Sequence, residues 1–145
     1  MLLKYFVSQE TGVVIVSLGH GDLLLESLRQ VACELDIHTG VVMTGIGSLN
    51  FGRIHAVVTN SMPPTDRFFD LPGPLEVVGF RGVIAAHEPH IHISLMDANG
   101  KFYGGHLEEG SVILTLSEIS ILPTPDIKIT RRIRDNSPLP LLDWE

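Results

Sequence analysis

The sequence predicts an α+β domain with a mostly antiparallel β-sheet of about seven or eight strands and one main packed α-helix. Two observations lead to this class. Only one stretch has the apolar periodicity of a long helix, and most other apolar runs are β-prone and bounded by turn residues. The length of 145 residues lies near the common size of one domain, so we expect residues 1–145 to form a single domain.

The first predicted elements are an opening hairpin and the helix. Residues 2–8 and 13–18 are short β-prone runs separated by turn residues. Asp22 is the expected N-cap of the helix. Apolar residues then recur at steps of three and four, namely Leu24, Leu28, Val31, Ala32 and Leu35.

The sequence after the helix predicts strands, one long loop and a C-terminal tail. The β-prone runs are residues 40–46, 51–59, 75–86, 90–96, 102–107 and 112–122. The glycine-containing stretch 44–48 is interpreted as a turn rather than as a backbone site for an anion. Residues 61–74 hold four of the nine prolines and predict a surface loop of the kind that often covers a site. The proline-containing, partly basic segment from about residue 123 predicts a tail that docks or frays.

Composition and charge narrow the function classes. The net charge of −7 disfavours long-range attraction to DNA or to anionic lipid, so direct DNA binding would need a local basic patch. The only cysteine, Cys33, excludes an intrachain disulfide and fits a reducing compartment. No apolar stretch approaches the ~18 residues of a transmembrane helix, and the N-terminus lacks a signal-peptide pattern. We expect a soluble, cytoplasmic protein without a membrane partner.

The most informative pattern is a hairpin that carries histidines on both strands. Residues 97–101 (D-A-N-G-K) predict a three-residue loop whose glycine takes the left-handed conformation. Continued outward, this register sets His92 opposite His106 and His90 opposite Glu108. Alternation assigns one face to the core and gives the other face all three imidazoles and the carboxylate.

Three neighbouring imidazoles predict a metal site made by His90, His92 and His106. Zinc fits because neutral imidazoles bind it at ~2.0 Å and three ligands leave a fourth position for water or a small-molecule ligand. Nickel, copper or iron would also accept imidazoles. Glu108 is a candidate metal ligand, a candidate partner that orients an imidazole, or a candidate catalytic base. The sequence leaves open whether the site is catalytic or structural.

Other interpretations of these residues remain. The histidines are also compatible with exposed strand positions that pair with Glu88, Glu108 or Glu109. A two-residue turn at residues 99–100 would move His106 to the opposite face. His20, His38, His55 and His87 have no spacing that singles them out, although His87 is a possible extra ligand. The isolated arginines Arg53, Arg67 and Arg81 are candidates for recognising an acidic ligand, but such arginines are usually solvated or paired. The tail cluster of Arg131, Arg132 and Arg134 is more typical of a solvated face.

Five blocks of the sequence together resemble the PPC domain, the plant and prokaryote conserved domain. They are G-D-L-L-L-E-S-L, V-V-M-T-G-I-G-S-L, G-P-L-E-V-V-G-F-R-G, P-H-I-H-I-S-L and G-G-H-L, and the resemblance runs from about Leu18 to Ile121. It implies a mostly antiparallel sheet with a packed helix, assembled as a homotrimer. It also implies that His90, His92 and His106 bind a metal, with zinc the expected occupant.

The resemblance also raises a DNA-associated role. In plants this domain follows an AT-hook, and stand-alone prokaryotic members are labelled as DNA-binding proteins. This chain has no Arg-Gly-Arg-Pro hook, and residues 74–78 (P-L-E-V-V) lack the arginine of the plant R-F-E-I-L motif. Three hypotheses follow: a homotrimeric metal-binding protein, a DNA-associated regulatory module, and a non-catalytic protein-interaction scaffold. Absence of duplex DNA binding even at ~50 mM salt would contradict the second.

Overall fold

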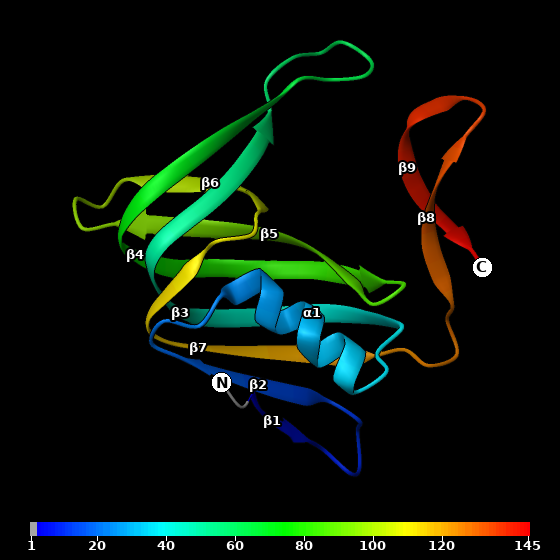
Figure 1. Cartoon of the computed structure of the whole chain (residues 1–145), viewed down its shortest axis with the longest axis horizontal. Helices are drawn as coiled ribbons and strands as arrows, with labels where there is room; N and C mark the ends of the chain where they lie inside the picture. The colour runs from blue at the N-terminus through cyan, green and yellow to red at the C-terminus, as the bar shows by residue number, and fades with distance from the viewer. Residues whose placement is uncertain (1–2) are drawn as a thin grey trace.

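The computed structural model describes residues 3–145 and consists mainly of antiparallel strands with one helix (Figure 1). The helix is α1 (Leu24–Glu34). The strands are β1 (Lys4–Val7), β2 (Val14–Gly19), β3 (Thr39–Val57), β4 (Asp66–Ala85), β5 (Glu88–Asp97), β6 (Phe102–Leu107), β7 (Val112–Pro123), β8 (Ile129–Arg134) and β9 (Ser137–Trp144). The predicted α+β class is therefore confirmed. Within residues 3–145, no helix is long and apolar enough to cross a membrane.

Seven strands form the main sheet in the order β1-β2-β7-β3-β4-β5-β6. All of its pairings are antiparallel. Strands β3 and β4 are 19 and 20 residues long and curve strongly, so the far end of β3 also pairs with β6. This additional pairing makes β3, β4, β5 and β6 close on themselves at one end of the sheet.

The core lies between α1 and the sheet, as the predicted helical periodicity requires. Leu24, Leu28 and Val31 are fully buried on the face of α1 that packs against the strands. Along β2 the buried and exposed residues alternate, because successive side chains of a strand point to opposite faces. The predicted N-cap is wrong: Leu23 occupies that position, while the Asp22 carboxylate accepts a hydrogen bond from the Gly19 amide at 2.7 Å.

Two predictions that were based on glycine and proline, the turn at 44–48 and the loop at 61–74, differ from the structure of β3 and β4. Residues 44–48 were interpreted as a turn but lie inside β3, where its pairing with β7 shifts register. The predicted loop at 61–74 is shorter, because β4 begins at Asp66 and pairs with the end of β3. Proline and glycine mark irregular positions of these strands rather than their ends.

The C-terminal segment forms an ordered hairpin of β8 and β9 beside the main sheet (Figure 1). Pro138 and Pro140 lie inside β9, which among residues 3–145 pairs only with β8, and an edge strand tolerates residues that lack an amide hydrogen. The hairpin is attached to the sheet by the Ala86 amide, which donates to the Ile129 carbonyl at 3.1 Å. Of the two predicted alternatives, docking and fraying, this segment docks against the sheet.

Candidate metal centre

The β5–β6 hairpin has the register that the sequence predicts. His92 pairs with His106, and the Asp97 amide donates to the Lys101 carbonyl at 2.9 Å. Gly100 has a φ of 77°, the left-handed conformation that a three-residue loop needs at this position. The alternative two-residue turn is thereby excluded.

Burial separates the two faces of the hairpin. On β5, Ile91, Ile93 and Leu95 are buried in the core, whereas His90 and His92 are exposed on the opposite face. The period of two in a β-strand explains this division, since every second side chain points away from the core. The predicted histidine face therefore lies outside the core, where a ligand has access to it.

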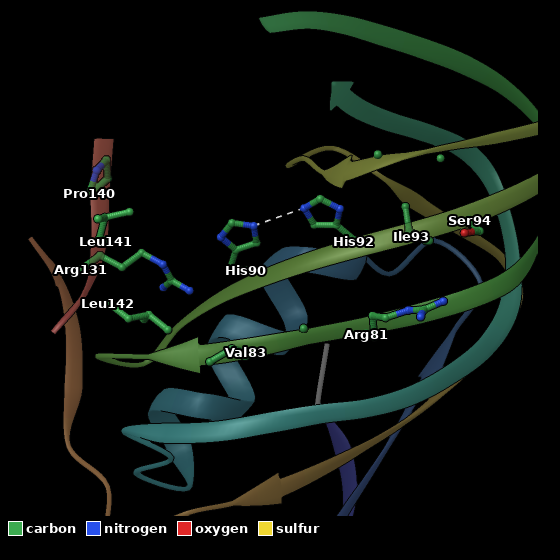
Figure 2. A pocket seen from close by; sticks show the side chains of 13 residues that line it. Arg81, Val83, His90, His92, Ile93, Ser94, Arg131, Pro140, Leu141 and Leu142 are labelled. Carbon is green, nitrogen blue, oxygen red and sulfur yellow. Dashed lines mark hydrogen bonds between the residues drawn. The ribbon is translucent and has the colours of Figure 1, made fainter. Parts of the chain in front are cut away.

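The three predicted histidines gather on this face. The Nε2 atoms of His90 and His92 are 3.4 Å apart (Figure 2). The ring centre of His106 lies 4.5 Å from that of His90 and 5.7 Å from that of His92. Two tetrahedral zinc ligands with bonds of ~2.0–2.1 Å are separated by about 3.3 Å. The spacing of His90 and His92 therefore fits two ligands of one metal ion.

A fourth histidine, His55, joins the cluster from β3. It pairs with His106 across β3 and β6, and the two rings stack with their centres 4.5 Å apart and an interplanar angle of 19°. Sequence reasoning missed His55, because no local spacing marks it. Only the pairing of β3 with β6, about 50 residues further along the chain, brings the two imidazoles together.

Glu108 directly follows β6, and its carboxylate contacts two histidines of the cluster. Its Oε1 atom lies 2.6 Å from Nδ1 of His55 and 3.3 Å from Nδ1 of His106. The second contact is close enough for an ion pair but is not aligned as a hydrogen bond, so Nδ1 of His106 is buried without a hydrogen-bond partner. The predicted pairing of His90 with Glu108 is wrong, because the Glu108 amide donates to the Arg53 carbonyl of β3 instead.

Two sets of possible ligands therefore share His106. The outer set is His90, His92 and His106, of which His90 and His92 are exposed. The inner set is His55, His106 and Glu108, whose ligand atoms lie within 4.8 Å of one another. In metal sites, a carboxylate at one nitrogen of a histidine commonly fixes the ring so that its other nitrogen can bind the metal. Glu108 beside Nδ1 fits this role and leaves Nε2 as the His106 nitrogen free to bind a metal.

The surroundings keep two of these imidazoles in the form that binds metals. Burial lowers the pKa of His90 to about 4, and the charges of His106 and Arg131 add to this effect. The pKa of His106 is also lowered, mainly by burial and then by His55. A lowered pKa means that each ring stays neutral near pH 7, and neutral imidazole is the metal-binding form.

A cleft of about 840 Å³ lies in front of His90 and His92. It is bounded by β4, β5 and β6 on one side and by the β8–β9 hairpin on the other (Figure 2). Arg81, Arg131, Leu141 and Leu142 are among its lining residues. The predicted covering loop at 61–74 does not line this cleft, so within the described residues the cover comes from the C-terminal hairpin.

The other charged and histidine residues considered from sequence have different partners. Glu88 and Glu109 both form ion pairs with Arg29, at 2.7 and 2.8 Å, rather than with the clustered histidines. His87 contacts the Asp36 carboxylate at 2.9 Å and is not part of the cluster. The interpretation of the histidines as simple partners of neighbouring glutamates therefore holds only for Glu108.

Fold and site together define a small α+β domain whose imidazole cluster opens into a cleft. The chain belongs to the Plants and Prokaryotes Conserved (PCC) domain family, whose model matches residues 5–125. This confirms the family that the five sequence blocks indicate.

Individual relatives are distant. The chain is 27% identical over 113 residues to the bifunctional protein GlmU of Synechococcus sp. (strain JA-2-3B'a(2-13)). That match covers 77% of this chain, which spans only 17% of the length of the relative.

Similar folds occur in two solved structures. A provisionally assigned DNA-binding protein from Bacteroides thetaiotaomicron is 16% identical with a TM-score of 0.83, and the match covers 99% of each chain. A metal-containing protein from Archaeoglobus fulgidus is 22% identical with a TM-score of 0.75, and the match covers 100% of this chain and 99% of the other. At sequence identities this low, the similarity establishes a shared fold and nothing further.

Proposed function

We propose that this protein binds one zinc ion through His90, His92 and His106. The observation that carries the proposal is the 3.4 Å separation of the His90 and His92 Nε2 atoms beside the ring of His106, with His90 and His92 lining the cleft. Three imidazoles suit zinc and leave a fourth position for water or another ligand. Zinc bound in this way would supply a Lewis acid and lower the pKa of a bound water toward ~7.

The chain's own residues complete the site. Glu108 and His55 hold His106 from its inner side, since the carboxylate contacts both rings. The carboxylate is thus engaged behind the metal ligands, which supports a positioning role over that of a catalytic base. The metal content of the Archaeoglobus fulgidus protein, which shares the fold, is further support for a metal in this domain.

The direct test is elemental analysis of tag-free protein purified without added metal, and again after reconstitution with zinc and removal of excess metal. We expect close to one zinc per chain after reconstitution. Protein that retains no metal after reconstitution would contradict the proposal and favour the protein-interaction scaffold. Nickel, copper or iron found at the same stoichiometry would replace zinc as the proposed occupant.

Glu108→Gln is expected to weaken zinc binding about tenfold without removing it. The amide keeps the size of the side chain but loses the negative charge that faces Nδ1 of His106, and such outer contacts typically contribute 10–100-fold to metal affinity. Competition with a chromophoric chelator measures the change. Glu109→Gln is the matched control, because Glu109 pairs with Arg29 outside the cluster. Equal affinities of the two variants would contradict the role given to Glu108.

We also propose that the chain assembles as a homotrimer, as the family resemblance implies. The sheet face opposite α1 exposes Phe6, Ile15 and Val41, with exposed fractions of 55%, 41% and 42%. Phe6 pairs with Ile15 on neighbouring strands, so these side chains form part of one apolar surface that association would cover.

Light scattering on the purified protein is expected to give three times the chain mass of 15.9 kDa. Ile15→Glu adds a charge to this apolar surface at a side chain that is 41% exposed in the single chain, so it should lower the mass while the chain remains folded. A wild-type mass equal to that of one chain at micromolar concentration would contradict the assembly.

The DNA-associated alternative has weaker support. The three arginines of β8 do not act as one basic surface: Arg134 forms an ion pair with Asp143 at 3.2 Å, and Arg131 lines the cleft. The net charge of −7 opposes attraction to a duplex. These observations favour a metal-dependent role over direct DNA binding.

A further inference from the structure

Arg131 places a positive charge across the cleft from the histidines. It lies on β8, and its side chain reaches toward His90 in Figure 2. The C-terminal hairpin thus contributes a charged group to the candidate metal centre as well as a wall.

This guanidinium has no protein partner among residues 3–145. Arg131 makes no ion pair within 4.0 Å and no side-chain hydrogen bond, whereas Arg29, Arg53 and Arg134 each pair with a carboxylate. Burial lowers the pKa of Arg131, and the charge of Glu88 opposes this effect. A partly buried guanidinium without a partner loses hydration that a bound anion would replace.

The cleft also lacks acidic side chains, although the whole chain is acidic. Among the described residues that line it, the ionisable ones are Arg81, His90, His92 and Arg131. The local charge therefore opposes the net charge of −7 and attracts anions. A metal held by the histidines would add two positive charges to the same wall.

Apart from Ser94, the rest of the lining is apolar or glycine, and the cleft has the size of a ligand site. Val83 of β4 and Pro140, Leu141 and Leu142 of β9 form an apolar part, while Gly104 and Gly105 leave space beside the histidines. Sites for small molecules commonly have volumes of about 300–1,000 Å³, mostly apolar walls and a few polar groups that fix orientation. The volume of about 840 Å³ lies within this range.

We propose that the cleft binds a small organic anion whose carboxylate or phosphate group lies between the metal and Arg131. Its apolar body packs on Val83 and the β9 leucines. This inference rests on the proposed zinc site, because the bound metal would supply one of the two positive charges that hold the anion. The guanidinium binds oxygens of the anion, a geometry for which arginine is well suited.

The test is calorimetric titration of zinc-loaded protein with benzoate, phenyl phosphate and the neutral analogue benzamide. We expect one of the two anions or both to bind, and benzamide to bind at least tenfold more weakly. Comparison of benzoate with phenyl phosphate distinguishes the two sources of the oxyanion. Equal binding of benzamide and the anions, or no binding of either anion, would overturn the inference.

Arginine variants test the position of the anion. Arg131→Ala should weaken the binding of the preferred anion about tenfold or more, as expected for the loss of a charged hydrogen-bond pair. Arg132→Ala is the matched control, because Arg132 is the next residue of β8 but does not line the cleft; its affinity should stay within about twofold of wild type. Equal effects of the two variants would overturn the role of Arg131.

Zinc content measured on the same samples separates the two proposals. Arg131→Ala should retain the zinc of the wild type, since Arg131 is not among the proposed ligands. Zinc-loaded protein that binds neither anion overturns only the inference about the cleft. Wild-type protein that cannot be loaded with zinc overturns the proposed function and, with it, the anion site at the metal.

Discussion

Replacing His92 with alanine is expected to weaken zinc binding by about 100-fold. Zinc sites with four ligands bind with roughly 10–16 kcal/mol, so the loss of one ligand removes on the order of 3 kcal/mol. The effect should be this large because His92 is one of the three proposed ligands: its Nε2 atom lies 3.4 Å from that of His90, and it pairs with His106. Competition with a chelator of known zinc affinity measures the change.

The control for this variant is His20→Ala. His20 hydrogen-bonds the Leu114 carbonyl and lies outside the cluster, so its loss should leave zinc affinity within about twofold of wild type. A His92→Ala protein that is folded and binds zinc as tightly as the His20→Ala protein would show that the outer set of histidines is not the site. In that case the inner set of His55, His106 and Glu108 would be the next candidate.

Gly105→Ala is expected to destabilise the protein by about 1–3 kcal/mol and to weaken zinc binding as well. A Cβ atom at residue 105 would collide with the backbone carbonyl of His55. Relief of this collision requires β6 to move away from β3, where His55 pairs with His106. The substitution therefore disturbs the strand pairing and the position of one metal ligand together. Denaturant unfolding of the metal-free protein gives the first effect, and chelator competition gives the second.

Gly104→Ala provides the neighbouring comparison. A Cβ atom at residue 104 would lie 3.4 Å from the Ile93 carbonyl, a close but tolerable contact. We expect the free energy of unfolding to change by less than about 1 kcal/mol. Alanine restricts the unfolded chain more than glycine does, and this stabilising effect offsets the close contact of the new Cβ atom with the Ile93 carbonyl. Equal free energies of unfolding for Gly105→Ala and Gly104→Ala would contradict the close packing of β6 against β3 at residue 105.

The β5–β6 hairpin was predictable from sequence because its determinants are local. The D-A-N-G-K loop fixes the register, Gly100 has the expected left-handed conformation, and alternation then assigns every side chain to a face. The proximity of His92 and His106 follows directly from that register. The helix was equally accessible, since its apolar spacing depends only on neighbouring residues.

The environment of His106 was not predictable in the same way. His55 joins it through the pairing of β3 with β6, which depends on the curvature of two long strands and has no local signal. Glycine and proline also do not mark the ends of β3 and β4, because in these strands they lie at bulges and register shifts rather than in loops. As a result, the contact of Glu108 with His55 was not anticipated.

The C-terminal hairpin changes the interpretation of the basic segment that contains Arg131. Its prolines suggested a tail, but an edge strand accommodates them, and the paired strands bring Arg131 and Leu142 to the cleft. Arg131 and Arg132 carry the same charge, but only Arg131 lines the cleft. The register of β8 and β9 is needed to distinguish them. Composition alone gives these two arginines the same role.

X-ray absorption at the zinc edge of the reconstituted protein tests the central claim most directly. The account predicts a first coordination shell of nitrogen and oxygen atoms at ~2.0 Å, with the outer-shell scattering of three imidazole rings. The His92→Ala protein, loaded at saturating zinc, should show one imidazole fewer. A wild-type spectrum with sulfur ligands, or with oxygen ligands and no imidazole scattering, would contradict a site made by His90, His92 and His106.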